Sequence, residues 1–489
     1  KKMNKINNYK IFYFVILFIL SIFISNQYLN KFENKLYKYG NYEYSSLLQE
    51  DGLRYIKEAE KIRIDTVNKK NFLISGGSYK FSFLYPRIIY FFNKIINQNK
   101  PMVGNNFIQL ENYKILIFFQ ILIFTLSLIF LFKVLREIFE YRLSSIIVTV
   151  LFLNPIIFQF HLSLFTESLF LSSLIFTFCF LLKSKNSLHF FLLGIFVGIL
   201  YMLRTIAILY PLVMIIYLII IKKKYIKLII YSSSLISGLI IILLLIGMHN
   251  YLRAGIFYFT PIQTKIDFET YMVPNILVKS KKLNQIQLKD HWDKRSQKIF
   301  ERNDFAFSKE FKKLKPREYL ILRSQKILKK STINLANEKE MVLFFNELRN
   351  ESFKTISDNK IVFLKIIIKN YFHSTLLNPV QVYFDAKYES WEDYKDSSDH
   401  QLWLKIRVII TILFLSLSLW GFLISIKKIN FELNALLFFS ILYFFITSCW
   451  LIGQTRYFVP SVMFLSFYFS LSLDKICLNF IKTTLKKVK

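Results

Sequence analysis

Ten apolar runs recur along this chain of 489 residues, and most have the length that crosses a lipid bilayer as a helix. A transmembrane helix needs roughly 17–25 mainly apolar residues. Hydrophobic residues make up 54% of the chain, which excludes an ordinary soluble enzyme. The sequence therefore predicts an all-α polytopic membrane protein of about ten transmembrane helices, at Ile11–Ser25, Ile115–Phe132, Ser144–Phe160, Leu164–Leu182, Leu188–Leu203, Ile206–Ile221, Ile226–Met248, Ile406–Ile426, Leu433–Ile452 and Tyr457–Leu473.

The short turns between these runs predict the orientation of the chain. The first run follows Lys5 and Lys10 and lacks a small-x-small cleavage site, so we expect an uncleaved anchor with a cytoplasmic N-terminus. With this orientation the C-terminus is also cytoplasmic, and every short cytoplasmic turn is basic, as the positive-inside rule requires. The basic residues of these turns and of the tail are Lys133, Arg136, Arg142, Lys183, Lys185, Lys222, Lys223, Lys224, Lys227, Lys427, Lys428, Lys486, Lys487 and Lys489.

The formal net charge of +33 arises from lysines scattered through every loop. Scattered cations favour an anionic lipid surface over nucleic acid, so we expect membrane lipids as partners and no nucleic acid. Abundant Lys, Asn, Ile and Phe are typical of an AT-rich genome, so we expect the protein in the plasma membrane of a bacterium. The six histidines show no metal-ligand spacing. No metal site or cofactor is therefore predicted, although a divalent metal is left open.

Two long segments fall on the outer side of the predicted topology, Asn26–Lys114 and Asn250–Lys405. They divide the chain into an N-terminal membrane module (1–249) that includes the first outer loop (26–114), an extracytoplasmic segment (250–405) and C-terminal membrane helices (406–489). We expect the extracytoplasmic segment to be mainly helical. Its apolar stretch Ile361–Ile368 is too short to span and is interrupted by lysines, so it is expected to rest on the membrane surface.

The first outer loop is expected to be structured. Apolar periodicity predicts a helix over Leu47–Ile62 and an interfacial helix over Phe81–Ile96. Between them, Asn68–Tyr79 contains two adjacent glycines and is predicted to be a flexible connection.

The link Asn154–Ser168 joins two apolar runs and is typical of the turn of a membrane hairpin. Asn154–Pro155 is expected to end a helix, because proline disfavours helical geometry in the residue before it. Glu167 stands at the mouth of the next run. A carboxylate near the centre of a membrane helix costs up to about 2.5–3.5 kcal/mol, so such a group usually faces a protein or water-lined cavity. Glu167 also suits the positive end of a helix dipole, worth about 0.3–1 kcal/mol.

Acidic and basic residues gather near membrane boundaries on the same outer side: Glu50, Asp51, Glu167, Arg204 and Arg456. This distribution indicates a single extracytoplasmic cavity. A carboxylate there can take a proton from an attacking hydroxyl, and arginines can neutralise a phosphate leaving group. A base and phosphate-binding arginines at the level of the lipid headgroups favour an enzyme that transfers a sugar from a lipid-linked phosphosugar. On spacing alone, however, the two arginines are equally well explained as residues that anchor helix ends at the interface.

Three sequence motifs resemble membrane-embedded GT-C glycosyltransferases: TESLFLSSLIF (Thr166–Phe176), LGIFVGILYMLRTIAILYP (Leu193–Pro211) and RYFVP (Arg456–Pro460). The chain is most similar to bacterial relatives of PIG-V-type mannosyltransferases, and more distantly to aminoarabinose and protein O-mannosyl transferases. EDGLRYIKEAEK (Glu50–Lys61) and FLYP (Phe83–Pro86) lie where these families carry an acidic loop motif. The resemblance implies inverting transfer of a single sugar, such as mannose, from a polyprenyl- or dolichyl-phosphate donor.

Asp51 is the best match to the family's catalytic acidic position, with Glu50 as the alternative base. The expected substrate-binding residues share the outer side of the membrane and are Arg204, Arg456, Tyr457, Glu167 and Arg87. The expected partners are the polyprenyl-phosphate-sugar donor and a glycan, lipid or protein acceptor. Two alternatives stay open. One is an envelope polysaccharide polymerase or ligase. The other is a lipid-linked-sugar flippase or transporter, which the sequence favours less because it shows no repeated pair of broken helices.

Overall fold

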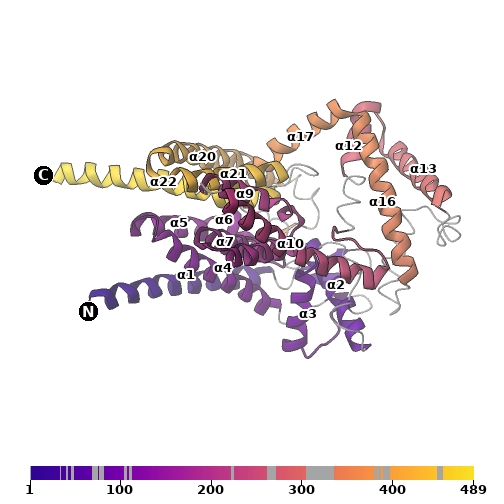
Figure 1. Ribbon diagram of the computed structural model, residues 1–489, viewed down its shortest axis with the longest axis horizontal. Coiled ribbons are helices and arrows are strands. Elements are labelled where there is room, and N and C mark those ends of the chain that lie inside the picture. The colour runs from indigo at the N-terminus through magenta and orange to yellow at the C-terminus, as the bar shows by residue number, and fades with distance from the viewer. Residues whose placement is uncertain are drawn as a thin grey trace.

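The computed structural model describes residues 2–32, 35–39, 42–45, 49–68, 75, 82–103, 107–108, 113–221, 225–261, 271–303, 335–378, 383, 387–388, 397–448 and 455–488. Each predicted apolar run lies mainly in helix, and these helices form one bundle (Figure 1). The helices of the bundle are α1 (Lys2–Phe32), α4 (Tyr113–Leu135), α5 (Tyr141–Leu153), α6 (Pro155–Phe158), α7 (Thr166–Lys183), α8 (Ser187–Leu203), α9 (Tyr210–Ile221), α10 (Tyr225–Ala254), α20 (Ser398–Lys428), α21 (Phe431–Ser448) and α22 (Thr455–Val488).

The polytopic, mainly helical membrane fold is confirmed, whereas the predicted count of ten spans stays a prediction. Among the described residues, seven helices are long and apolar enough to cross a membrane, and a bent pair makes eight. The apolar helices α8 and α9 have only 17 and 12 residues, at or below the usual minimum for a span.

The predicted span Ser144–Phe160 is not one straight helix. Helix α5 ends at Leu153, and Asn154 adopts an extended conformation whose side-chain oxygen accepts a 3.0 Å hydrogen bond from the backbone of Ile156. Pro155 then begins α6, because the missing N–H of proline is no loss in a first helical turn. The two parts bend by 47°. The expected end of a helix at Asn154–Pro155 is therefore observed inside a predicted span.

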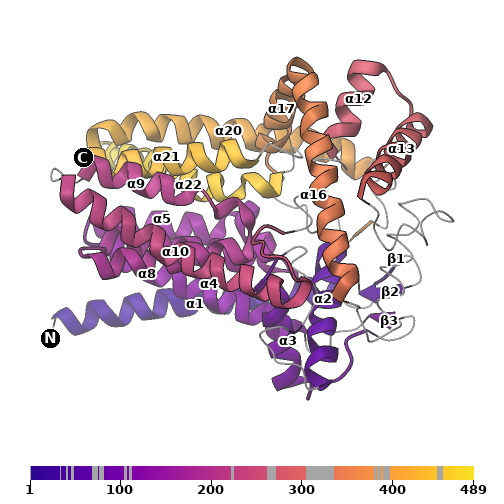
Figure 2. The same ribbon diagram turned by 45° about the vertical axis from the view of Figure 1, so that its right-hand side comes forward.

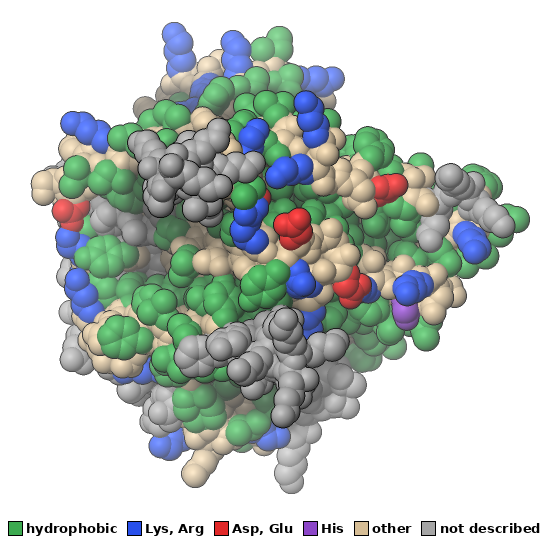
Figure 3. Space-filling view, turned by 90° about the vertical axis from the view of Figure 1, so that its left-hand side faces the viewer, with side chains coloured by type: hydrophobic (Ala, Val, Ile, Leu, Met, Phe, Trp, Pro, Cys, Tyr) green, Lys and Arg blue, Asp and Glu red, His purple; other side chains and the backbone are tan. Residues whose placement is uncertain are grey.

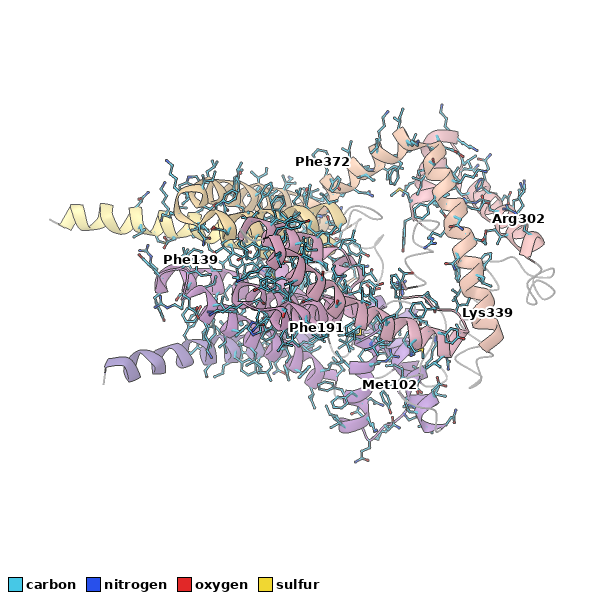
Figure 4. All side chains as sticks on the ribbon, viewed as in Figure 1. Met102, Phe139, Phe191, Arg302, Lys339 and Phe372 are labelled. Atoms are coloured by element: carbon cyan, nitrogen blue, oxygen red, sulfur yellow. The ribbon has the colours of Figure 1, made fainter. Side chains whose placement is uncertain are left out.

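Helices α8 and α10 cross closely at two glycines. A Cβ atom added to Gly194 would lie 2.0 Å from the carbonyl oxygen of Leu235, and one added to Gly238 would lie 2.1 Å from that of Phe191 (labelled in Figure 4). Small residues let membrane helices approach and gain van der Waals contact that lipid does not provide. This crossing fixes the position of the end of α8, where Arg204 lies.

We expect Gly194→Leu to force α8 and α10 apart and to lower the free energy of unfolding by about 1–3 kcal/mol, as overpacking does. Thermal unfolding of the purified protein in detergent measures this effect. Leu188→Ala, at an exposed position of the same helix, is the control and is expected to shift the transition little. Equal transition temperatures for the parent and Gly194→Leu would contradict the close crossing.

Both described ends of the chain lie at one end of the bundle (Figure 1). Figure 3 views this end, where Lys and Arg side chains are spread over the surface. Here the buried carboxylate of Asp474 accepts hydrogen bonds of 2.7 and 3.2 Å from Arg142, and Lys428 lies 3.9 Å away. These contacts join α5, α20 and α22.

The first outer loop lies at the opposite end and contains two helices, α2 (Gln49–Val67) and α3 (Tyr85–Ile96). Both predicted helices are therefore found; α2 continues past the predicted end at Ile62, and α3 begins at Tyr85, later than the predicted Phe81. A small sheet, which the sequence pattern did not predict, lies beyond them (Figure 2). Its strands are β1 (Leu36–Tyr39), antiparallel to β2 (Tyr42–Ser45), and β3 (Phe107–Ile108), parallel to β2. The predicted flexible connection lies almost wholly outside the described residues.

The described parts of the second outer segment are mainly helical. Helices α12 (Val273–Lys281), α13 (Gln285–Asn303), α16 (Leu335–Asp358) and α17 (Lys360–Thr375) project beyond the bundle at the end that carries the first outer loop (Figures 1 and 2). Membrane helix α10 continues into the start of this segment, to Ala254, and membrane helix α20 begins within its end, at Ser398. The proposed division into three domains stays a prediction.

Candidate active site

Three helix N-termini meet at the end of the bundle that lies away from the chain termini. The first turns of α2, α7 and α22 carry Asp51, Glu167 and Arg456, respectively. The N-terminus of a helix carries unpaired N–H groups and about half a positive charge, so it favours carboxylates and phosphates. The local start of each helix therefore makes this region suitable for anionic groups.

Asp51 contacts an arginine that is distant in the sequence. Nη1 of Arg456 donates to Oδ2 of Asp51, and Nη1 of Arg54 lies 3.3 Å from Oδ1. Nη2 of Arg456 also donates a 3.2 Å hydrogen bond to the Tyr457 hydroxyl. Asp51 is thus held between two guanidinium groups, one from its own helix and one from α22.

A second carboxylate–arginine pair lies deeper. Nη1 of Arg204 is 2.5 Å from Oε1 of Glu167, and the Thr166 hydroxyl donates a 3.0 Å hydrogen bond to the other carboxylate oxygen. Arg204 directly follows α8 and has an extended backbone, so its side chain leaves the helix axis. The end of α8 thereby faces the start of α7.

Tyr457 joins the two pairs. The guanidinium carbons of Arg204 and Arg456 lie 5.0 and 5.1 Å from the centre of its ring, within the range of cation–π attraction. On the other side, the Tyr55 hydroxyl lies 3.5 Å from that of Thr166, which closes the contacts back to α2. We call this set the carboxylate–arginine ring; its members are Asp51, Tyr55, Thr166, Glu167, Arg204, Arg456 and Tyr457.

The ring has an exposed side and a buried side. The exposed fraction of the side chain falls from 36% for Arg54 to 21% for Arg456 and 19% for Asp51. It falls further to 10% for Arg204 and 5% for Glu167. Asp51 is therefore the carboxylate of the ring that a substrate entering from the aqueous side meets first.

A hydrogen-bonded support holds α2 in place behind the ring. The Tyr55 ring packs edge-on against the buried Tyr85 ring at 5.1 Å. The Tyr85 hydroxyl donates a 2.6 Å bond to the Gln120 side chain, which in turn donates a 3.1 Å bond to the Ser163 carbonyl. The first outer loop is thereby connected to α4 and to the turn before α7.

The structure brings together five of the predicted site residues: Asp51, Glu167, Arg204, Arg456 and Tyr457. Arg87 is not placed in this ring, since its guanidinium group lies 3.8 Å from the centre of the Phe83 ring and 3.5 Å from Nδ1 of His249. The side chain of Glu50 lies outside the described residues. Sequence reasoning missed Arg54 and Tyr55, although their spacing of three and four residues from Asp51 on a predicted helix places them on the same side of it.

A second polar cluster connects the first outer loop to α10. Asp65, near the end of α2, lies 3.2 Å from Nη1 of Arg253, and both side chains are buried. The Arg87–His249 contact links α3 to the same helix. Because a broken buried ion pair is strongly destabilising, these contacts fix α2 and α3 on the bundle.

Electrostatics keep Asp51 ionised. Burial raises the pKa of its carboxyl group, but the positive charges of Arg456 and Arg54 outweigh burial, so the pKa lies below its ordinary value. A lowered pKa in the folded state contributes stability above the unfolded-state pKa of about 3.9, and this contribution is lost as the pH falls through the folded-state pKa. At neutral pH, Asp51 is a carboxylate.

If Asp51 acts as a base, protonation of its carboxylate is not expected to reduce activity between pH 7 and about 5, because its pKa lies below this range. Arg456→Gln removes the main opposing charge and leaves burial together with the weaker effects of Arg54 and Arg204, so the pKa of Asp51 is expected to rise. The acid limb of a plot of log kcat/KM against pH should then move to higher pH, in addition to any loss of rate. An unmoved limb in Arg456→Gln would show that Asp51 does not set it.

In the part of the chain that the structure describes, no group of three His, Cys, Asp or Glu side chains is arranged to hold a metal ion. The ring itself offers two carboxylates, each already in contact with an arginine.

The fold and the site define a polytopic helical membrane protein with a carboxylate–arginine ring at one end of its bundle. No family model matches the chain, and no curated protein matches it by sequence. Among solved structures, it is similar to the oligosaccharyltransferase AglB of Archaeoglobus fulgidus in complex with an inhibitory peptide and a dolichol-phosphate (11% identity, TM-score 0.47). It is also similar to an Archaeoglobus fulgidus oligosaccharyltransferase in the apo form (10% identity, TM-score 0.49).

Each likeness covers 98% of this chain and 52% of the other, so the chain spans about half the length of these enzymes.

Proposed function

We propose that this chain is an integral-membrane glycosyltransferase of GT-C type. It moves a single sugar, for which the sequence resemblance suggests mannose, from a polyprenyl-phosphate donor to an extracytoplasmic acceptor, with inversion. The observation that carries the proposal is the contact of Asp51 with Arg456, beside a second pair, Glu167 and Arg204, in one partly exposed ring. A base and two phosphate-binding cations are thus within reach of one substrate.

In this proposal the acceptor hydroxyl attacks the anomeric carbon from the exposed side. Asp51 takes the proton of that hydroxyl as the new carbon–oxygen bond forms, a role worth about 10²–10⁴-fold in rate. The bond between the anomeric carbon and the phosphate oxygen breaks, and polyprenyl phosphate departs with the electron pair. Arg456 and Arg204 neutralise the charge that develops on the phosphate. Attack opposite the leaving group gives inversion.

The arginines are occupied by carboxylates before the donor binds, because Arg456 contacts Asp51 and Arg204 contacts Glu167. A donor phosphate competes for both guanidinium groups. When Arg456 turns toward the phosphate, the charge that lowers the pKa of Asp51 is partly withdrawn. Asp51 then becomes a stronger base, so the base is activated only when the donor is bound.

The lipid tail of the donor is assigned to the side of α3. Phe91 and Ile95 are exposed on this helix, which belongs to the same outer loop as Asp51. Such a face suits the boundary between headgroups and acyl chains. The positive-inside pattern of the short turns supports a position of the ring on the extracytoplasmic side, and the AT-rich composition supports a bacterial plasma membrane.

Mass spectrometry of lipid-linked sugars and glycans, in cells with and without this protein, tests the proposal. We expect a polyprenyl-phosphate monosaccharide to accumulate, and one glycan, lipid or protein product to lose a sugar residue, when the protein is absent. Identical lipid-linked sugars and products in both cells would contradict it. An accumulated oligosaccharide-diphosphate lipid would instead indicate a polymerase or ligase.

A further inference from the structure

Helix α17 presents an apolar stripe to its surroundings. Ile361, Leu364, Ile368 and Phe372 follow one another at helical spacing, and each residue is 55–72% exposed. Spacings of three and four residues place these side chains on one face. Four large apolar residues in one exposed row on an outer helix indicate a surface that is covered in the working protein.

The opposite face of α17 is already packed. Ile366 is buried in a cluster with Met272 and Ile276 of the α12 region. Ser374 is buried on the same side of the helix. The exposed stripe is thus a second apolar face on a helix whose first face is occupied.

The C-terminal end of α17 lies at the end of the membrane bundle. The Tyr371 hydroxyl donates a 3.2 Å hydrogen bond to the carbonyl of Ile446, and its ring stacks on Phe445 at 4.8 Å, both at the last turn of α21. Arg407 of α20 donates a 3.0 Å hydrogen bond to the carbonyl of Leu376, just after α17. Figure 4 shows Phe372 at the edge of the bundle, where the outer helices leave it.

The apolar stripe is therefore continuous with the surface that the bundle presents to lipid. Ile446 of α21 and Ile409 of α20 are both large, exposed apolar residues close to these contacts. An occupant of the stripe next to Phe372 must share the environment of the ends of the membrane helices. That environment is the boundary between headgroups and acyl chains.

The charges beside the stripe select the kind of lipid. Lys360, Lys365 and Lys369 are all exposed, and α17 contains no acidic residue. Lys365 and Lys369 follow one edge of the stripe at a spacing of four residues. Lysines beside an apolar row are typical of helices that lie on anionic bilayers, where each cation near the surface strengthens binding.

We propose that α17 docks on the bilayer surface on the side of the carboxylate–arginine ring and binds anionic lipid headgroups. Ile368 and Phe372 enter the boundary between headgroups and acyl chains, while Lys365 and Lys369 contact the headgroup phosphates. This inference is independent of the proposed enzymatic activity, since it rests on the surface of α17 and on its contacts with the ends of the membrane helices.

The test uses the full-length protein in lipid nanodiscs, with its three native cysteines replaced by alanine and Phe372→Cys carrying an NBD fluorophore. Discs contain phosphatidylcholine alone or increasing amounts of phosphatidylglycerol. We expect NBD emission to shift to the blue, and to be quenched by doxyl-labelled lipid, as the anionic fraction rises. In Lys365→Gln/Lys369→Gln the ratio of docked to undocked helix should fall by about fivefold for each lysine removed.

The matched control places the probe at Phe353→Cys, an exposed apolar position on α16, a helix that projects beyond the bundle. Its emission is expected to stay water-like in every disc. Water-like emission at position 372 in anionic discs would overturn the proposal. So would a blue shift that is the same at every anionic fraction and unchanged in Lys365→Gln/Lys369→Gln. A blue shift in detergent that grows with protein concentration would also overturn it, because the stripe would then bind a second copy of the chain.

Discussion

Replacing Asp51 with asparagine is expected to lower sugar transfer by about 10²–10⁴-fold while the protein remains folded and inserted in the membrane. Asparagine keeps the size of the side chain and an oxygen for Arg456, but it cannot take a proton from the acceptor. The rate of polyprenyl phosphate release from reconstituted proteoliposomes measures the loss.

Glu50→Gln is the matched control, since it makes the same chemical change on the adjacent residue of α2. It is expected to retain most activity. Full activity in Asp51→Asn would remove Asp51 from the mechanism. If the loss appeared only in Glu50→Gln, the base would be Glu50, the alternative that the sequence left open.

The second large effect is expected at the deeper pair. Arg204→Met leaves the Glu167 carboxylate buried without its cation, which typically costs about 3–5 kcal/mol of stability. The helix dipole at the start of α7 and the Thr166 hydroxyl offset part of this, so we expect about 2–4 kcal/mol. Thermal unfolding in detergent measures the change.

Adding Glu167→Leu to Arg204→Met separates stability from activity. A buried ion pair can often be replaced by apolar residues of similar size without loss of stability. The double variant should therefore recover most of the unfolding temperature but remain inactive, because it lacks the cation assigned to the donor phosphate. Recovery of both stability and transfer would show that the pair serves the fold alone.

The membrane helices could be predicted from the sequence because each one corresponds to a local run of apolar residues. The bend at Asn154–Pro155 was visible as a helix end, but its place inside one predicted span was not, since apolar periodicity continues through it. The antiparallel pair β1–β2 was overlooked, although its strands are separated by only Gly40 and Asn41, a spacing typical of a hairpin. Strand β3 was missed because it pairs with β2 across a loop that contains two helices. Such pairing leaves little local pattern.

The site was predictable in its composition but not in its pairing. Glu167, Arg204 and Arg456 were found because charged residues beside apolar runs gather on one side of the predicted topology, and Asp51 because it also matches the acidic position of the families that the chain resembles. Which carboxylate meets which arginine depends on tertiary structure, since Asp51 and Arg456 are 405 residues apart in the chain. Arg87 was predicted to bind the donor phosphate with Arg204 and Arg456 only because it lies on the same predicted side of the membrane. Its contact with His249 depends on how α3 packs on α10.

Donor binding by two single variants is the most direct measurement of the division of roles between base and phosphate clamp. Asp51→Asn should bind the polyprenyl-phosphate sugar at least as tightly as the parent, because a neutral amide holds Arg456 less strongly than a carboxylate does and competes less with the phosphate, yet this variant should not turn the donor over. Arg456→Gln should raise the Kd by about tenfold or more, since a charged hydrogen bond worth about 1.5–3 kcal/mol is lost. Weaker binding in Asp51→Asn together with unchanged binding in Arg456→Gln would contradict a shared site with these two roles.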